Sequence, residues 1–207
     1  MGIDLTVCVL TRNKSITVST LHTLLNLSSA CFQGGHRIFI HFVEELSSLS
    51  KLVKTQERIL WINYGYALDQ ESFPTIFSST HECLVYPCVN ENVSWDSFKK
   101  RLETLEPLHQ KALSFDTDVD IKISDGYWRV KKTCPNVFLI DCKSIDKKLR
   151  TRKGEGLKIP NDAEILFSKF TECGVKMIAY TKANVIVHKY HECIGNIMES
   201  ASVKFVN

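Results

Sequence analysis

The fold is decided by the stretch Glu57-Arg58-Ile59-Leu60-Trp61-Ile62-Asn63-Tyr64-Gly65-Tyr66. Its apolar run from Ile59 to Ile62 is typical of a strand buried on both faces of a sheet. Polar and glycine residues from Asn63 to Asp69 then indicate a turn. Because ligands of open α/β sheets bind beyond the carboxyl ends of the strands, we expect the functional site where this strand ends.

Outward toward the N-terminus, the pattern predicts a β-α-β unit. Ile3 to Leu10 reads as a strand, and Ser15 is the expected N-cap of a helix that stops at Gly34-Gly35. Arg37 to Val43 is the next expected strand, parallel to the first because a helix joins them. Glu44 to Lys54 is a predicted second helix that leads to the central strand. Three parallel strands are therefore expected by about residue 63.

The remainder is predicted to alternate helices and strands. Pro160 to Cys173 has a helical apolar face, with Asn161 or Asp162 as its cap and Gly174 after its end. The basic segment Lys143 to Ile159 is expected to be an exposed loop. Further helices are expected at Gln70 to Phe77 and Trp95 to Leu105, strands at Glu82 to Val89, Asn136 to Cys142, Val175 to Tyr180 and Asn184 to His188, and a β-hairpin near Tyr127 to Lys132.

Composition is ordinary for a globular protein: 207 residues, 44% hydrophobic and 24% charged. The net charge of +3 is too small to indicate a nucleic-acid partner. Eight cysteines in this length are too sparse for a disulfide-stapled scaffold, which favours a reducing, cytoplasmic location. No stretch approaches the roughly 20 apolar residues of a transmembrane helix, so no membrane span is expected.

The order of elements resembles that of a compact GT-A nucleotide-sugar glycosyltransferase. The resemblance rests on the first strand ending in Val9-Leu10-Thr11-Arg12-Asn13, on Arg58 to Tyr66 where that family carries Asp-x-Asp, and on Pro160-Asn161-Asp162-Ala163-Glu164 followed by a strand and His188. It implies a GT-A-like α/β fold with a mostly parallel open sheet, flanking helices and a small mixed C-terminal sheet. It further implies one domain over residues 1–207, with a nucleotide-binding half (1–105) and an acceptor-side half (106–207).

The chain departs from that family at the metal-binding motif. The family's two carboxylates hold a divalent cation that neutralises the donor diphosphate. Here the equivalent positions are Asn63 and Gly65, and neither offers a charged ligand, so Mn²⁺ or Mg²⁺ has weak support. Asp69 follows within the same turn and is the candidate substitute ligand, and the resemblance makes His188 a further candidate. Asp116-Thr117-Asp118 spells a displaced Asp-x-Asp and is a second metal candidate.

The resemblance also implies roles for individual residues. Arg12 and Asn13 would contact the nucleotide or its phosphates, together with Asn63 and Gly65, and His188 would complete the donor site. Asp162 or Glu164 would be the base that takes the proton of the acceptor hydroxyl. Two plainer roles stay open: Asp162 as a helix cap and Arg12 as a surface turn residue.

The sequence contains no motif that indicates one of the other site or reaction classes considered below. Ile121 stands where a calcium loop starting at Asp116 needs glycine, and Tyr127 where it needs glutamate. A Gly-x-Ser-x-Gly elbow, a Walker phosphate loop and a dinucleotide glycine fingerprint are all absent from the sequence. Two hypotheses follow. The first is a transferase that moves a sugar from a nucleotide-sugar donor to a glycan, lipid or protein acceptor. The second is a non-catalytic module of the same fold that binds a partner or a sugar nucleotide.

Overall fold

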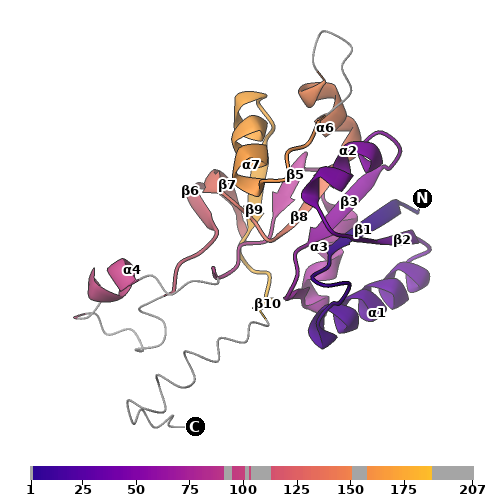
Figure 1. Ribbon diagram of the computed structural model, residues 1–207, viewed down its shortest axis with the longest axis horizontal. Helices are drawn as coiled ribbons and strands as arrows, with labels where there is room; N and C mark the ends of the chain where they lie inside the picture. Colours follow the sequence, from indigo (N-terminus) through magenta and orange to yellow (C-terminus); the bar gives the residue numbers. More distant parts are fainter. Residues whose placement is uncertain (1, 91–94, 101–102, 104–112, 151–157, 188–207) are drawn as a thin grey trace.

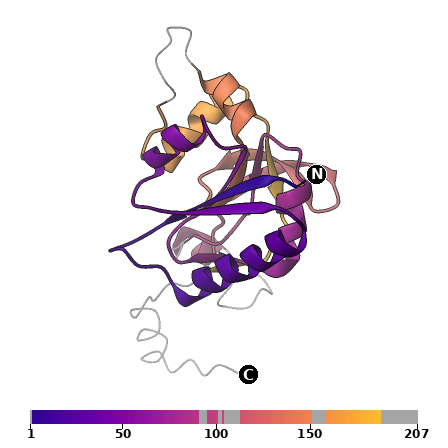
Figure 2. The same ribbon diagram turned by 90° about the vertical axis from the view of Figure 1, so that its right-hand side faces the viewer.

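In the computed structural model, an eight-stranded sheet runs through the middle of the protein with helices on both sides (Figure 1). The structure describes residues 2–90, 95–100, 103, 113–150 and 158–187. The strand order is β2-β1-β3-β8-β5-β9-β7-β6, and β10 pairs with β4 in a separate two-stranded sheet. Figure 2 shows α1 along one side of the sheet and the helices α6 and α7, in orange, on the other.

The large sheet is mostly parallel. Strands β2, β1, β3, β5, β9 and β6 run in one direction, while β8 and β7 run in the other. The small sheet, in which β10 (Val185–Val187) meets β4 (Tyr66–Leu68), is antiparallel. The predicted fold class, an α/β fold with a mostly parallel open sheet, flanking helices and a small additional sheet, is confirmed.

The N-terminal β-α-β unit agrees with its prediction. Strand β1 (Asp4–Leu10) pairs in parallel with β2 (Arg37–Val43) and with β3 (Arg58–Ile62). Helix α1 (Val18–Gln33) joins β1 to β2, but its cap is Thr17 and not Ser15. Ser15 instead closes a tight turn with Arg12, so the helix begins two residues later than expected.

The segment predicted as a helix at Glu44 to Lys54 is a 3₁₀ turn followed by one helical turn, so its helix is shorter than expected. The helix predicted at Gln70 to Phe77 is present, first as a 3₁₀ turn and then as α3. The bounds are η1 Leu46–Ser48, α2 Leu49–Leu52, η2 Gln70–Ser72, α3 Phe73–Ser78, β5 Cys83–Val85, α4 Trp95–Lys100, β7 Tyr127–Thr133, β8 Val137–Asp141, α7 Ala163–Glu172 and β9 Met177–Tyr180.

One predicted loop is partly a helix, and one segment without a sequence-based assignment is a strand. Cys142–Leu149 is helix α6, whose N-cap Asp141 accepts a hydrogen bond from the Ser144 N–H at 2.8 Å. Its buried residues Cys142 and Ile145 anchor it to the sheet, so only part of the predicted loop is irregular in the described chain. Strand β6 (Thr117–Ser124), left unassigned by the sequence pattern, pairs with β7 across the turn at Gly126.

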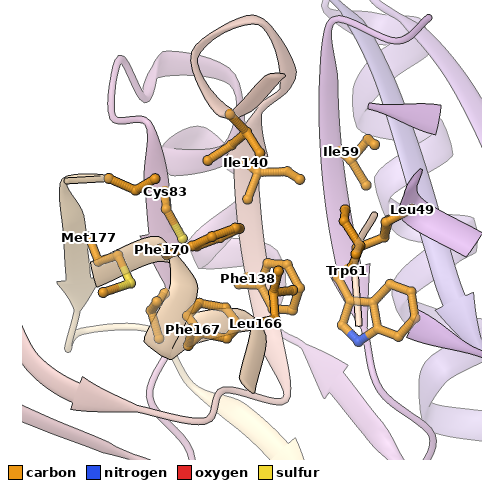
Figure 3. Packing of buried hydrophobic residues seen from close by; sticks show 14 of the residues in the cluster. Leu49, Ile59, Trp61, Cys83, Phe138, Ile140, Leu166, Phe167, Phe170 and Met177 are labelled. Atoms are coloured by element: carbon orange, nitrogen blue, oxygen red, sulfur yellow. The ribbon is translucent and has the colours of Figure 1, made fainter. Parts of the chain in front are cut away.

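A hydrophobic core covers each face of the sheet. On one face, Trp61 and Phe138 from neighbouring strands stack with centroids 6.1 Å apart, and Phe167 of α7 meets Phe138 edge-on at 5.1 Å (Figure 3). On the other face, Leu24 and Leu27 of α1 pack over the strands. Burial on both sides explains why the run Ile59 to Ile62 carries no polar alternation.

Candidate functional site

Two hollows lie at the edge of the sheet where β1, β2 and β3 end, and a third lies between the start of β6, the end of β7 and the start of α7. The first, of about 390 Å³, is lined by Thr11, Lys14, Ile16, Phe42 and Glu44. The middle one, of about 230 Å³, is lined by Leu10, Glu44, Glu45, Leu46, Trp61, Asn63, Pro135, Phe138, Asn161 and Ala163. The third, of about 240 Å³, is lined by Asn90, Phe115, Asp116, Asp118, Lys132, Thr133, Cys134 and Glu164.

The three hollows adjoin one another. Glu44 lines both the first and the middle hollow. The middle and third hollows meet at chain neighbours, Pro135 beside Cys134 and Ala163 beside Glu164. The three hollows are called here together the carboxyl-edge groove. The segment after β3 and the start of α7 both line the middle hollow, through Asn63 and through Asn161 and Ala163.

The turn after β1 places Lys14 at one end of this groove. Asn13 and Lys14 have φ angles of 52° and 60°, and Arg12 and Ser15 exchange backbone hydrogen bonds of 3.2 and 3.0 Å. Two successive left-handed residues are the signature of a type I′ turn, in which asparagine is common and lysine is strained. Arg12 and Asn13 are exposed and do not line the groove, whereas Lys14 does.

Asn63 and Gly65 shape the turn between β3 and β4. Both polar atoms of the Asn63 side chain are engaged: Nδ2 donates to Asn136 Oδ1 at 2.9 Å, and Oδ1 accepts from the Tyr64 N–H at 2.9 Å. Gly65 has a φ angle of 80°, where a side chain would be strained. Neither residue is free to act as a charged metal ligand.

The other metal candidates do not complete a cation site. Asp69 caps η2, accepting from the Ser72 N–H at 3.2 Å and from the Ser72 hydroxyl. Residue His188 lies outside the described residues. Across the part of the chain that the structure describes, no group of three or more His, Cys, Asp or Glu side chains is placed to hold a metal ion. The described residues at the Asp-x-Asp position therefore do not suit Mn²⁺ or Mg²⁺.

The two carboxylates of the second metal candidate, Asp116 and Asp118, differ in burial and in their contacts. Asp116 is buried, and its carboxylate accepts hydrogen bonds from the backbone N–H groups of Cys88 and Asn136, each at 3.1 Å. It also accepts from the Cys88 thiol, the Thr117 hydroxyl and the Asn136 amide. With its lone pairs used in this way, Asp116 holds together the wall of the third hollow. Asp118 is exposed at the same hollow.

The start of α7 presents its two carboxylates differently. Asp162 Oδ1 accepts from the Glu164 and Ile165 N–H groups at 2.7 and 3.1 Å, so this side chain is the helix cap. Glu164 lines the third hollow, with Lys132 Nζ 3.4 Å from its Oε1. Asn161 faces the middle hollow, and its Oδ1 accepts from the Leu46 N–H at 2.9 Å. Of the predicted bases, Glu164 is the one that lines the groove.

Sequence reasoning missed several residues of the groove. Glu44 and Glu45 follow β2 directly, so their place at the carboxyl edge was available from the predicted strand order. Phe115 is 59% exposed and Phe42 57%, which puts an aromatic ring at each end of the groove. These two rings carried no sequence signal, because exposed and buried phenylalanines look alike in a pattern.

Comparisons with known proteins find likeness in structure alone. No protein-family model and no curated protein matches the chain. A protein from STIV is 10% identical over 92% of this chain and 96% of its own, with a TM-score of 0.48. A glucose-1-phosphate thymidylyltransferase from Bacillus anthracis, in complex with sucrose, is 8% identical over 100% and 98%, with a TM-score of 0.47. A Drosophila galactosyltransferase in complex with manganese, UDP-Gal and xylobiose is 9% identical over 99% and 81%, with a TM-score of 0.47.

The described helices bear on the expectation that the chain has no membrane span. None of them combines the length and the apolarity needed to cross a lipid bilayer.

Proposed function

We propose that this protein is a glycosyltransferase that moves a sugar from a nucleotide-sugar donor to a glycan, lipid or protein acceptor without a bound metal ion. The observation that carries the proposal is the carboxyl-edge groove, with the ammonium of Lys14 at one end and the carboxylate of Glu164 at the other. Transfer needs a cation for the donor diphosphate and a base for the acceptor, with room for a sugar between them.

The donor is proposed to lie in the first and middle hollows. Lys14 would pair with the diphosphate, and Arg12 lies two residues away on the same turn. The left-handed backbone of Lys14 supports this assignment, because strained residues cluster at ligand sites. The sugar would lie against Asn161 and the carboxylate of Glu45, whose oxygens are acceptors suited to sugar hydroxyls.

The acceptor is proposed to lie in the third hollow, beside Glu164. Its hydroxyl oxygen attacks the anomeric carbon of the sugar and forms the new carbon–oxygen bond. The bond from that carbon to the phosphate oxygen breaks, and the nucleoside diphosphate leaves with the electron pair. Glu164 takes the hydroxyl proton. Asp162 keeps the first turn of α7 in place through its two backbone hydrogen bonds and is a positioning residue.

The proposal is tested first by ligand binding without metal. A thermal-shift panel of UDP-, GDP- and CMP-sugars is run with Mn²⁺ and, separately, with EDTA. A ligand at 100 times its Kd stabilises the folded state by about 2.7 kcal/mol, which raises the Tm of a domain of this size by several degrees. We expect a rise in EDTA that is reduced in Lys14→Gly, a variant that removes the charge and suits the backbone. Lys54→Ala, an exposed lysine outside the groove, is the control. Stabilisation only with Mn²⁺ would refute the metal-free mechanism.

Turnover is tested on α7 with three variants. Release of nucleoside diphosphate from the donor that binds, in the presence of candidate acceptors, should be lost in Glu164→Gln while donor binding is kept. Asp162→Asn should stay active, because asparagine also caps helices. Glu172→Gln, at the far end of the same helix, is the matched control. Loss of turnover in Asp162→Asn with full activity of Glu164→Gln would overturn the assignment of the base.

A second function is supported by a different observation. The engaged side chain of Asn63 and the absence of a metal-ligand cluster among the described residues suit a non-catalytic module that binds a sugar nucleotide or a partner. Donor binding in the thermal-shift panel without any turnover, across the acceptors tested, would favour this function over transfer.

A further inference from the structure

The two edge strands of the large sheet differ in how well they are protected from pairing with a strand of another chain. Strand β6 carries Asp118, Asp120 and Lys122, and its register with β7 shifts three times. Charges and bulges of this kind prevent an edge strand from pairing with another chain. Strand β2 has neither protection. It pairs with β1 over seven residues without a register shift, and Ile38 to Val43 contains no Asp, Glu, Lys or Arg.

Strand β2 also exposes large apolar side chains. Phe39, Ile40 and Phe42 are 44%, 37% and 57% exposed, on both faces of the strand. The order of the sheet begins at β2, so no described strand covers its outer side. A flat, apolar, unpaired edge is a template for β-strand addition.

Helix α1 also exposes large apolar side chains. Its 16 residues include no Asp, Glu, Lys or Arg, although half-exposed helices ordinarily place charged residues on their outer face. Val18, Leu21, Leu25 and Phe32 are 74%, 44%, 59% and 88% exposed and follow a helical spacing along one stripe. An uncharged stripe of this kind marks an interaction surface.

The stripe lies on the exposed side of α1. Asn26, Ser29 and Gln33 line a hollow shared with Phe73 and Phe77 of α3, so their side of the helix faces α3. The buried residues of α1 turn toward the sheet. At 100° per residue, the stripe is centred about 100° around the helix from the residues that face α3, and further still from the buried ones. Figure 1 shows α1 and β2 at the same end of the molecule.

We propose that β2 and the α1 stripe form the interface with a second copy of this chain. The partner would add its own β2 antiparallel to this one about a two-fold axis, joining two eight-stranded sheets, and the two α1 helices would pack against each other. A second copy is favoured because the strand is self-complementary. Arg37 starts β2 and pairs with Asp4 of β1, but its side chain stays 74% exposed. Glu44 follows the end of the strand, so antiparallel pairing brings the partner's carboxylate beside this guanidinium at both ends.

The proposal is tested by sedimentation velocity between about 1 and 100 µM. We expect a species of twice the 23.6 kDa chain mass. Ile40→Lys places two like charges close to the two-fold axis and should weaken dimerisation at least 100-fold, with circular dichroism checking that the variant folds. Ile121→Lys makes the same change on the β6 edge and should leave the dimer intact. A monomer at every concentration, or larger assemblies that grow with concentration, would overturn the proposal.

A charge exchange tests the orientation of the pair. Arg37→Glu alone should weaken the dimer, as should Glu44→Lys, because each makes like charges meet. Arg37→Glu also removes the ion pair with Asp4, so circular dichroism checks that this variant folds. Mixing these two proteins should restore dimerisation, since every charged contact between them is then attractive. Pairing of the mixture no tighter than that of either variant alone would rule out the antiparallel arrangement.

Discussion

Asp116 offers the sharpest test of how the groove is built. Asp116→Ala leaves the backbone N–H groups of Cys88 and Asn136 without their acceptor. The Thr117 hydroxyl keeps a partner in Thr133, 2.7 Å away, and adds little to the loss. An orphaned buried donor costs about 1–3 kcal/mol, so two of them lower the free energy of unfolding by about 4 kcal/mol.

The isosteric substitution Asp116→Asn should lower the free energy of unfolding by less than Asp116→Ala does. Asp116→Asn retains one acceptor oxygen, and its NH₂ group meets a donor on the other side, so one backbone N–H loses its acceptor. The expected loss is about 2 kcal/mol, half that of the alanine variant. Asp118→Asn, exposed two residues away, is the control and should change stability by less than about 0.5 kcal/mol.

The assay is urea unfolding followed by tryptophan fluorescence and far-UV circular dichroism, with coincident transitions as the test for two-state behaviour. The reasoning predicts the order alanine, asparagine, control, from the largest loss to the smallest. A loss below about 1 kcal/mol for Asp116→Ala would show that Asp116 does not hold the Cys88 and Asn136 segments.

Three further predictions concern stability and reactivity. Arg58 donates to the carbonyl groups of Ile76, Phe77 and Ser79 at 2.7, 3.3 and 2.7 Å, so Arg58→Met should cost about 2 kcal/mol in the same urea assay; an unchanged midpoint would contradict that role. Burial raises the pKa of the Cys8 thiol to about 12 and raises the pKa of Cys83, Cys88 and Cys142. Ellman's reagent at pH 8 with peptide mapping should therefore label exposed Cys134 and Cys173 first, and fast labelling of Cys8 would count against the core. Desolvation raises the pKa of Glu82, but hydrogen bonds from Lys148 Nζ and the Lys176 N–H, both at 2.7 Å, outweigh it and lower the pKa overall. Because the folded-state pKa lies below the unfolded one, this stabilisation is present above about pH 4.3 and is lost as the pH falls through the folded-state pKa. Glu82→Gln should flatten the acid limb of a stability–pH curve, and an unchanged limb would refute the assignment.

Local patterns predicted the elements near the N-terminus well. Strands β1, β2 and β3 followed from apolar runs bounded by polar turns. The cap of α1 was misplaced because Ser15 and Thr17 are both good caps, and the left-handed turn at Asn13 and Lys14 decides between them. Helix α6 was missed because its basic residues hid the short apolar face of Cys142 and Ile145.

The sequence did not predict which strands pair when they lie far apart in the chain. Strand β8 was recognised as a strand, but its antiparallel position between β3 and β5 joins segments more than fifty residues apart and leaves no local trace. Strand β6 does alternate polar and apolar residues from Asp118 to Ser124, but its acidic residues were interpreted as turn residues, and the strand is almost wholly exposed. For the site, the sequence predicted a position where β3 ends, and Asn63 there lines the middle hollow together with Asn161. The sequence indicated Arg12 as a contact to the donor, whereas Lys14 is the residue of that turn that lines the first hollow.

Binding of a nucleotide sugar in the carboxyl-edge groove without metal can be followed by hydrogen–deuterium exchange in EDTA, with and without the nucleotide sugar that stabilises the protein most. We expect slower exchange in the Thr11–Ser15 turn, after β2 at Glu44 to Leu46, and at the start of α7. Protection confined to the hollow between α1 and α3, with these three segments unchanged, would show that the nucleotide sugar binds outside the groove.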